Sequence, residues 1–286
     1  FEVDDIIAYR DLPKIMDKTV NPCADFYTYA CGKWKDNLVI PPETGHYGQM
    51  DLIQEKVKSE LKTILDRDDI KLNGKNSDAV RKAKDFYKAC MDSKAIAKRG
   101  VIPMLKAIKD LGSWTVTNDS ISGQFDDKNW TLQDAHTSLL LRGFNAFFSL
   151  VVEVDDKNNK IRVPTFDQFV LSLDKPVYYT GSKSEQYHDA FVDYFVQIAT
   201  LLGGKNATQA AEDVWDFEKQ LATQMLPEDK RNDPLNIYNS MTIDEFQNAT
   251  GNWVDIKLLL GVYFKRKLHG NETIISRSHN YITKLN

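Results

Sequence analysis

The sequence lacks any long run of apolar residues. No stretch approaches the roughly 20 residues that a membrane-spanning helix needs, so we expect no membrane segment in this chain. It also lacks a basic excess, because 37 Lys and Arg stand against 41 Asp and Glu for a net charge of −4. Such a balance offers no electrostatic reason to bind nucleic acid. The first residues show no leader pattern, so we expect any targeting or anchoring segment to have been removed.

The histidine spacing of a zinc peptidase is also missing. No two of the five histidines lie four positions apart, and none belongs to a His-Glu-x-x-His motif: His46, His136, His188, His269 and His279. That motif matters because two imidazoles one helical turn apart reach one metal, while the glutamate activates its water. No serine elbow, phosphate-binding loop or dinucleotide fingerprint occurs either. The sequence therefore predicts no catalytic residue, metal site or cofactor within this chain.

Cysteine is scarce, and its count is odd. The three cysteines are Cys23, Cys31 and Cys90. In a secreted chain an odd number implies a free thiol or a partner elsewhere. Cys23 and Cys31 could bridge each other and leave Cys90 alone, or all three could pair with cysteines outside this chain. Reduced, buried thiols of a cytosolic protein are the third interpretation.

The sequence contains several N-glycosylation sequons. Asn-x-Ser/Thr occurs five times with a non-proline middle residue, at Asn118, Asn129, Asn206, Asn248 and Asn271. One sequon is common by chance, but five favour passage through a secretory pathway. We therefore predict an extracellular glycoprotein, either secreted or the ectodomain of a membrane-anchored protein. A chain that is merely rich in Asn and Thr is the alternative.

Helical periodicity dominates the rest of the chain. Apolar residues repeat at helical spacing over about 53–65, 80–91, 187–202 and 210–225, and we expect these stripes to face a core. The second stripe places Cys90 inward. Thr242 followed by Glu245 predicts a capping box at the start of another helix. Around Phe147–Val163, β-branched and aromatic residues flank an Asp- and Asn-rich solvated turn, which predicts a β-hairpin. The predicted fold class is mainly α-helical with a small β-hairpin.

One segment and several later blocks resemble a known family. Asn21 to Trp34, Asn-Pro-Cys-Ala-Asp-Phe-Tyr-Thr-Tyr-Ala-Cys-Gly-Lys-Trp, resembles the opening motif of ectodomains in the neprilysin and endothelin-converting enzyme family of zinc metallopeptidases. The later blocks follow in the family's order: Ile40–Glu43 leading to Tyr47-Gly48, Lys82–Met91, Tyr178-Tyr179, Glu228–Pro234 and Tyr238–Thr242. Together they cover essentially the whole chain in register.

The resemblance implies a domain organisation and a partner. Residues 1–286 resemble the amino-terminal region of such an ectodomain: about 1–50 would wrap the catalytic domain of the parent, and about 51–286 would form part of a helical lid. The last residues resemble a point inside that lid. The family's zinc ligands lie beyond the matched region, so zinc is expected only in the complete parent. The resemblance also implies that the three cysteines bridge to the missing carboxy-terminal catalytic portion.

The same comparison suggests substrate-binding residues. In the family, the stretch matching His46–Asp51 carries an arginine, supported by an aspartate, that holds the free carboxylate of short peptides. Asp51 matches the aspartate, but His46 stands where the arginine would be. Histidine offers one donor and is largely neutral at pH 7, whereas arginine offers a permanent two-pronged fork. The alternatives are an exposed loop histidine and a first-turn helix acid.

Three functions stay open on this basis. The chain could be the amino-terminal, non-catalytic portion of a neprilysin-like zinc metalloendopeptidase that hydrolyses small peptides outside the cell. It could be a catalytically inactive secreted relative that acts as a peptide-binding, decoy or immune-modulating protein. It could also be an isolated subdomain or antigen without activity. A bare apolar surface where another portion should pack favours the first, and polar side chains covering that surface favour the second.

Overall fold

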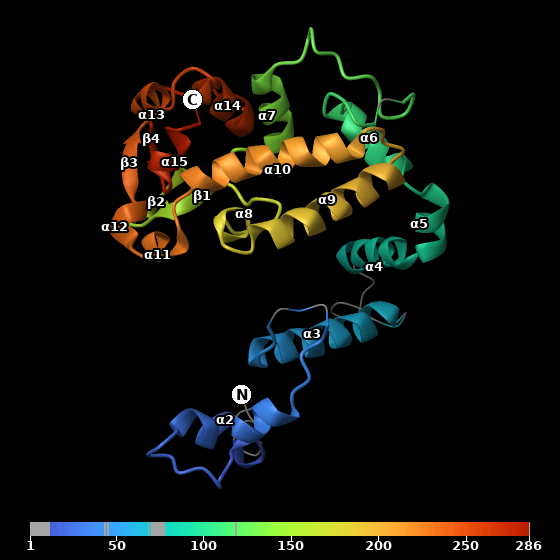
Figure 1. Cartoon of the computed structure of the whole chain (residues 1–286), viewed down its shortest axis with the longest axis vertical. Helices are drawn as coiled ribbons and strands as arrows, with labels where there is room; N and C mark the ends of the chain where they lie inside the picture. The colour runs from blue at the N-terminus through green and yellow to red at the C-terminus, as the bar shows by residue number, and fades with distance from the viewer. Residues whose placement is uncertain are drawn as a thin grey trace. The chain divides into compact units, whose positions relative to one another are not determined.

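The chain forms two compact units, Phe1–Lys94 and Ala95–Asn286. The computed structural model in Figure 1 describes residues 12–42, 44, 46–67, 69, 78–117 and 119–285. Among these residues, no helix is both long enough and apolar enough to cross a membrane. The boundary near residue 94 separates two units that are each compact. The division near residue 50, which follows the parts of a parent enzyme, stays a prediction.

The first unit is helical and has little core of its own. Its main helices are α2 (Phe26–Asn37), α3 (Gln49–Asp66) and α4 (Asp78–Met91). Helix α2 begins after Asp25, whose carboxylate accepts a hydrogen bond from the Thr28 amide at 3.0 Å. Gly32 is the one buried residue of these three helices, where an added Cβ would lie 3.0 Å from the Asp17 Cβ. This unit therefore gains little stability from burial of apolar surface.

The two helices predicted over 53–65 and 80–91 are confirmed as α3 and α4, but the prediction that their apolar stripes face inward is wrong. Val57 and Leu61 of α3 are 46% and 50% exposed. Cys90 of α4 is exposed as well. Periodicity shows which face of a helix is apolar, but no described residue of the first unit covers this one.

The second unit contains the remaining described helices and a small sheet. They are α5 (Ser93–Arg99, beginning at the last two residues of the first unit), α6 (Ile102–Asp110), α7 (Leu132–Leu141), α8 (Val177–Thr180), α9 (Ser184–Leu201), α10 (Ala207–Gln224), α11 (Glu228–Arg231), α12 (Pro234–Ile237), α13 (Ile243–Thr250), α14 (Ile256–Phe264) and α15 (His279–Ile282). The long helices α9 and α10 run side by side (Figure 1). They confirm the helices predicted over 187–202 and 210–225, and Gly203, at φ +78°, follows the first of them as a stop signal.

The predicted hairpin is confirmed as β1 (Phe148–Asp155) and β2 (Asn158–Gln168), which pair antiparallel. Its turn is solvated as predicted at Asp156–Asn159, which are exposed, whereas Asp155 at the start of the turn is only 5% exposed. The Asp155 carboxylate accepts hydrogen bonds from the Lys157 and Asn158 amides at 2.7 and 2.9 Å. Burial is tolerated here because these donors satisfy the charge.

Two short strands extend the hairpin into a four-stranded sheet. Strand β4 (Thr273–Ser276) runs parallel to β2, and β3 (Asn239–Thr242) pairs antiparallel with β4. The strand order is β1-β2-β4-β3. Each added strand has four residues, too few for a clear alternating pattern, so the sequence did not reveal them.

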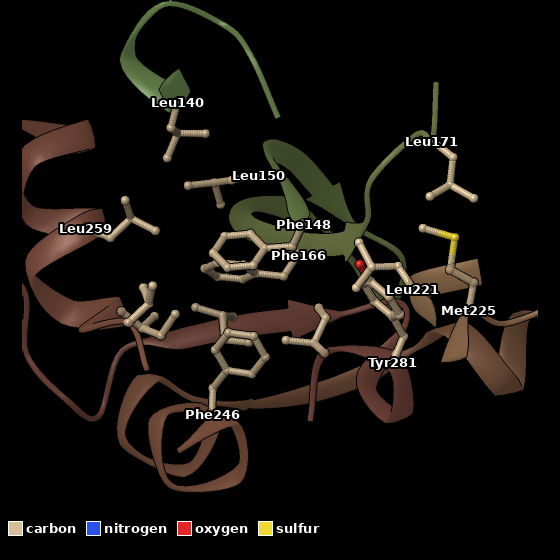
Figure 2. Close-up of a cluster of buried hydrophobic side chains, with 14 of the residues drawn as sticks. Leu140, Phe148, Leu150, Phe166, Leu171, Leu221, Met225, Phe246, Leu259 and Tyr281 are labelled. Atoms are coloured by element: carbon tan, nitrogen blue, oxygen red, sulfur yellow. The ribbon is translucent and has the colours of Figure 1, made fainter. Parts of the chain in front are cut away.

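The core lies between this sheet and the helices that follow it. Figure 2 shows Phe148 and Phe166 of the hairpin beside Phe246 of α13 and Leu259 of α14. The Phe166 and Phe246 rings are 4.6 Å apart between centroids, within the range of favourable aromatic pairs. Tyr281 is buried at the same core and donates its hydroxyl to the Phe147 carbonyl at 2.6 Å. This hydrogen bond ties the last helix to the hairpin.

Candidate functional site

The predicted substrate-binding pair lies at the start of α3. His46 is exposed in the preceding loop, and Asp51 occupies the third position of the helix. The Asp51 carboxylate accepts a hydrogen bond from the Gly48 amide at 2.7 Å, which satisfies a backbone donor at the helix start. No hydrogen bond joins His46 to Asp51 among the described residues. The geometry gives Asp51 a helix-capping contact, and a role in substrate binding stays a prediction.

A neighbouring contact fixes the same loop to the helix. Tyr47 donates its hydroxyl to the Glu55 carboxylate at 2.6 Å. This hydrogen bond to Glu55 raises the pKa of Tyr47 to about 12, because ionisation would break the bond and place two anions together. Tyr47 is therefore a neutral donor at physiological pH. The contact holds the residue that follows His46 against α3.

The three cysteines are free thiols in the structure. Cys23 and Cys90 are exposed, and Cys31 is half-buried. The local bridge between Cys23 and Cys31, left open by the sequence, does not form here. Burial of all three as inert thiols also does not occur. Exposed thiols can be reached by a partner cysteine, so this placement is compatible with bridges to another polypeptide segment.

The structure exposes four of the five sequon asparagines, namely Asn129, Asn206, Asn248 and Asn271. Asn118 lies outside the described residues. Asn206 adopts the left-handed conformation, at φ +54°, just before α10. Asn248 instead lies within α13. Exposure permits a glycan at each of the four, and glycosylation itself stays a prediction.

A charged cluster that the sequence did not reveal fixes the segment resembling the family block Glu228–Pro234. Arg231 of α11 donates two hydrogen bonds to Asp167 of β2, at 2.8 and 2.7 Å, and Ser278 donates to the same carboxylate. Burial alone would raise the pKa of Asp167, but the bonds from Arg231 and Ser278 outweigh it and lower that pKa. The two-pronged geometry makes this a strong link between β2 and α11. The polar composition of Glu228–Pro234 was the available signal, but it did not identify the partner.

A second polar cluster is buried where the block Tyr178-Tyr179 lies. Glu218 of α10 accepts hydrogen bonds from the Ser172 amide and hydroxyl, at 3.2 and 2.8 Å, and from the Tyr179 hydroxyl. Burial, followed by the bond to Glu218, raises the pKa of Tyr179. Every donor here has an acceptor, so the cluster stabilises the packing of α8 on α10.

The side chains that the structure describes do not form a zinc site. Among the described residues, no group of three His, Cys, Asp or Glu side chains is placed to hold a metal ion. The two histidines with a buried, unpartnered ring nitrogen, His136 and His279, belong to different elements. His136 lies among aromatic rings and binds the Ala146 carbonyl at 2.7 Å. We therefore derive no metal-dependent step from this chain.

Comparison with known proteins places the chain in a family. The model described as Peptidase family M13, for the amino-terminal region, matches residues 22–286. An endothelin-converting enzyme homolog of Locusta migratoria is 30% identical over 288 residues, which is 98% of this chain and 38% of the relative. Neprilysin of Homo sapiens is 30% identical over 291 residues, covering 94% and 38%. Endothelin-converting enzyme 1 of Bos taurus is 31% identical over 280 residues, covering 94% and 35%.

Solved structures show the same fold. The zinc metalloprotease Zmp1 of Mycobacterium tuberculosis, in complex with an inhibitor, matches with a TM-score of 0.73 over 95% of this chain and 39% of that one. PepO from Lactobacillus rhamnosis matches with a TM-score of 0.68 over 93% and 40%. Both are 15% identical to this chain, so they speak for its fold alone.

These matches identify the chain with the helical amino-terminal region of a neprilysin-like peptidase family. It belongs to peptidase family M13. The resemblance and the fold class predicted from the sequence are thereby confirmed. The chain spans less than two fifths of the length of these curated relatives.

Proposed function

We propose that this chain is the non-catalytic, amino-terminal portion of a zinc metalloendopeptidase that cleaves small peptides outside the cell. Its carboxy-terminal partner portion would supply the zinc ligands and the acid/base residues. Family membership supports the reaction class, because the family that matches residues 22–286 is described as a peptidase family. The absence of a His-Glu-x-x-His motif from the sequence supports the division of labour.

The observation that carries this proposal is the bare apolar face of the first unit. Helices α3 and α4 have no buried residue, yet their exposed side chains include Met50, Ile53, Val57, Leu61, Ile64, Phe86 and Met91. A solvated helix gains nothing from apolar residues repeated on one side, whereas a helix that packs on another domain needs them. The same observation speaks against the inactive, secreted relative, whose face would have become polar. No finding favours that alternative.

The remaining parts of the proposal follow from exposed groups. His46 and Asp51 would contribute to the binding of the peptide substrate, and an imidazole would hold a carboxylate less firmly than the two-pronged guanidinium of arginine. Cys23, Cys31 and Cys90 would form disulfide bonds with the catalytic portion. Asn118, Asn129, Asn206, Asn248 and Asn271 would carry glycans in an extracellular protein.

Disulfide mapping of the natural protein tests the proposal. The protein is alkylated, digested without reduction and analysed by mass spectrometry, with a reduced digest as the control. We expect the peptides that contain Cys23, Cys31 and Cys90 to be linked to peptides from outside this sequence, and reduction to release them. Alkylated, unlinked cysteines in an active peptidase would contradict the predicted bridges. A protein with no catalytic portion and no peptidase activity would contradict the enzyme proposal itself.

A further inference from the structure

A basic cavity lies in the second unit, between the end of α10, the α11–α12 segment and α15. Its volume is about 350 Å³. Three basic side chains line it, those of Lys230, Arg277 and Lys284, and its described lining residues include no acidic side chain. Because a cavity wall of one sign raises the local concentration of the opposite charge, this one favours an anion.

The polar and charged side chains that line this cavity differ in whether they already have an ion-pair or hydrogen-bond partner. Arg277 donates to Glu153 at 2.7 Å and lies 3.2 Å from Asp156, so its charge is largely balanced. Lys284, in contrast, has no ion-pair partner in the described part of the chain. The Nδ1 atom of His279 is buried and makes no hydrogen bond.

A larger apolar cavity adjoins the basic one. Its volume is about 900 Å³, and it shares Thr223, Gln224 and Lys284 with the basic cavity. The rest of its lining is mostly apolar: Leu132, Phe147, Phe217, Leu221, Trp253 and Leu285, with Gln220 beside them. Lys284 is its one charged residue among those described. The Trp253 Nε1 atom is buried and makes no hydrogen bond either.

We propose that the two adjoining cavities form one binding site for a carboxylate attached to an apolar group. The carboxylate would lie at Lys284, and the apolar group would lie against the rings of Phe217 and Trp253. Two sources carry this chemistry, the free carboxyl end of a short apolar peptide and a medium-chain fatty acid. The site lies wholly in the second unit and uses neither His46 nor the cysteines. It therefore stands or falls separately from the proposed proteolytic role.

The distribution of charge favours a monoanion. A phosphate or sulfate group is normally held by several unpaired cations or by backbone amides together. Here Arg277 is already paired with Glu153, and the Lys230 ammonium lies 3.9 Å from the exposed Asp229 carboxylate. The Lys284 ammonium group beside the apolar cavity therefore suits a ligand with one negative charge next to an apolar group.

Calorimetric titration of the 286-residue chain tests the ligand chemistry. The probes are N-acetyl-leucyl-phenylalanine and decanoate, each compared with its uncharged amide. We expect saturable binding of at least one acid, with its amide at least about fivefold weaker, because a charge-assisted hydrogen bond is lost. The acid that binds more tightly identifies the source. Equal affinity of acid and amide, or no saturable binding of either acid, would overturn the proposal.

Four variants locate the site. Lys284→Met should weaken the binding of the acids about three- to tenfold and leave the binding of the amides unchanged. Phe217→Ala should weaken the binding of acids and amides alike. The matched controls are Lys219→Met on α10 and Tyr194→Ala on α9, both exposed and outside the two cavities. Circular dichroism checks that each variant is folded. Acid affinities that Lys284→Met and Phe217→Ala leave at the level of the controls would place binding elsewhere and refute this site.

Discussion

His188 of α9 joins that helix to α10 through a carboxylate of α10. Its Nε2 atom lies 2.7 Å from the Glu212 carboxylate of α10, and its Nδ1 atom lies 3.0 Å from Asp189. The hydrogen bond to Glu212, then that to Asp189, raises the pKa of His188 above its ordinary value of 6.5. The protonated ring can donate to both carboxylates at once, so the contact between α9 and α10 is strongest when His188 is charged.

This contact predicts a pH dependence of stability. Because the folded pKa of His188 exceeds the unfolded one, its contribution is fully present below about pH 6.5 and is lost as the pH rises through the folded value. We expect His188→Gln to lose up to about 1 kcal/mol at pH 5.5 and much less at pH 8.5, since the pair is partly solvated.

Thermal unfolding across that pH range measures the effect. His269→Gln, which replaces an exposed histidine, is the matched control and should keep the profile of the unmodified chain. If the difference between His188→Gln and the unmodified chain were the same at pH 5.5 and pH 8.5, the ionised contact would not contribute.

At the scale of the element, α13 shows how a local signal supports the core. The Thr242 hydroxyl accepts a hydrogen bond from the Glu245 amide at 3.2 Å, and the Glu245 carboxylate accepts one from the Thr242 amide at 2.8 Å. This is the capping box that the sequence predicted, and it is confirmed. Ile243 and Phe246, which follow at once, are fully buried. The box therefore fixes the start of a helix whose first turn packs in the core.

Removal of the cap should destabilise the second unit. We expect Thr242→Ala to lower the free energy of unfolding by about 1 kcal/mol, because a backbone donor of the first turn loses its acceptor. Thr242→Ser keeps the hydroxyl and should recover most of the loss. Urea unfolding followed by tryptophan fluorescence measures both. Equal midpoints for the Ala and Ser variants would show that the hydroxyl contributes nothing.

At the scale of the whole molecule, the two units differ in what stabilises them. The second unit buries a contiguous apolar cluster around its sheet, whereas the helices of the first unit leave theirs in solvent. Charged residues introduced on the first unit's apolar face should therefore lower the stability of the isolated chain only slightly. We expect Val57→Glu with Leu61→Glu to change the free energy of unfolding by less than about 0.5 kcal/mol. Leu259→Ala, at a fully buried position, should cost about 2–5 kcal/mol.

Self-association is a second test of whether that face is exposed. Sedimentation velocity should show less association for the doubly charged variant than for the unmodified chain, because an exposed apolar stripe promotes non-specific contacts. Urea unfolding followed by far-ultraviolet circular dichroism gives the stabilities. A large loss of helix on introducing the two glutamates would show that the face is already packed in this chain.

The sequence by itself determined the features that depend on near neighbours. Helices α3, α4, α9 and α10, the hairpin and the Thr242 capping box all arise from contacts within a few residues, and their periodicity or spacing is visible in the chain. The ordered motif blocks likewise identified the family. His46 and Asp51 were reached only through that resemblance, since nothing in their local chemistry distinguishes a ligand-binding pair from a helix start.

Only the tertiary structure decided which residues meet across long separations. Pairing of β2 with β4 joins residues more than 100 positions apart, and Arg231 finds Asp167 across 64. Such contacts depend on how the whole chain is folded, and a four-residue strand or a single arginine carries no sign of its partner. Burial was decided in the same way. The stripe on α3 looks like a core stripe in the sequence, but a side chain is buried only where another surface covers it.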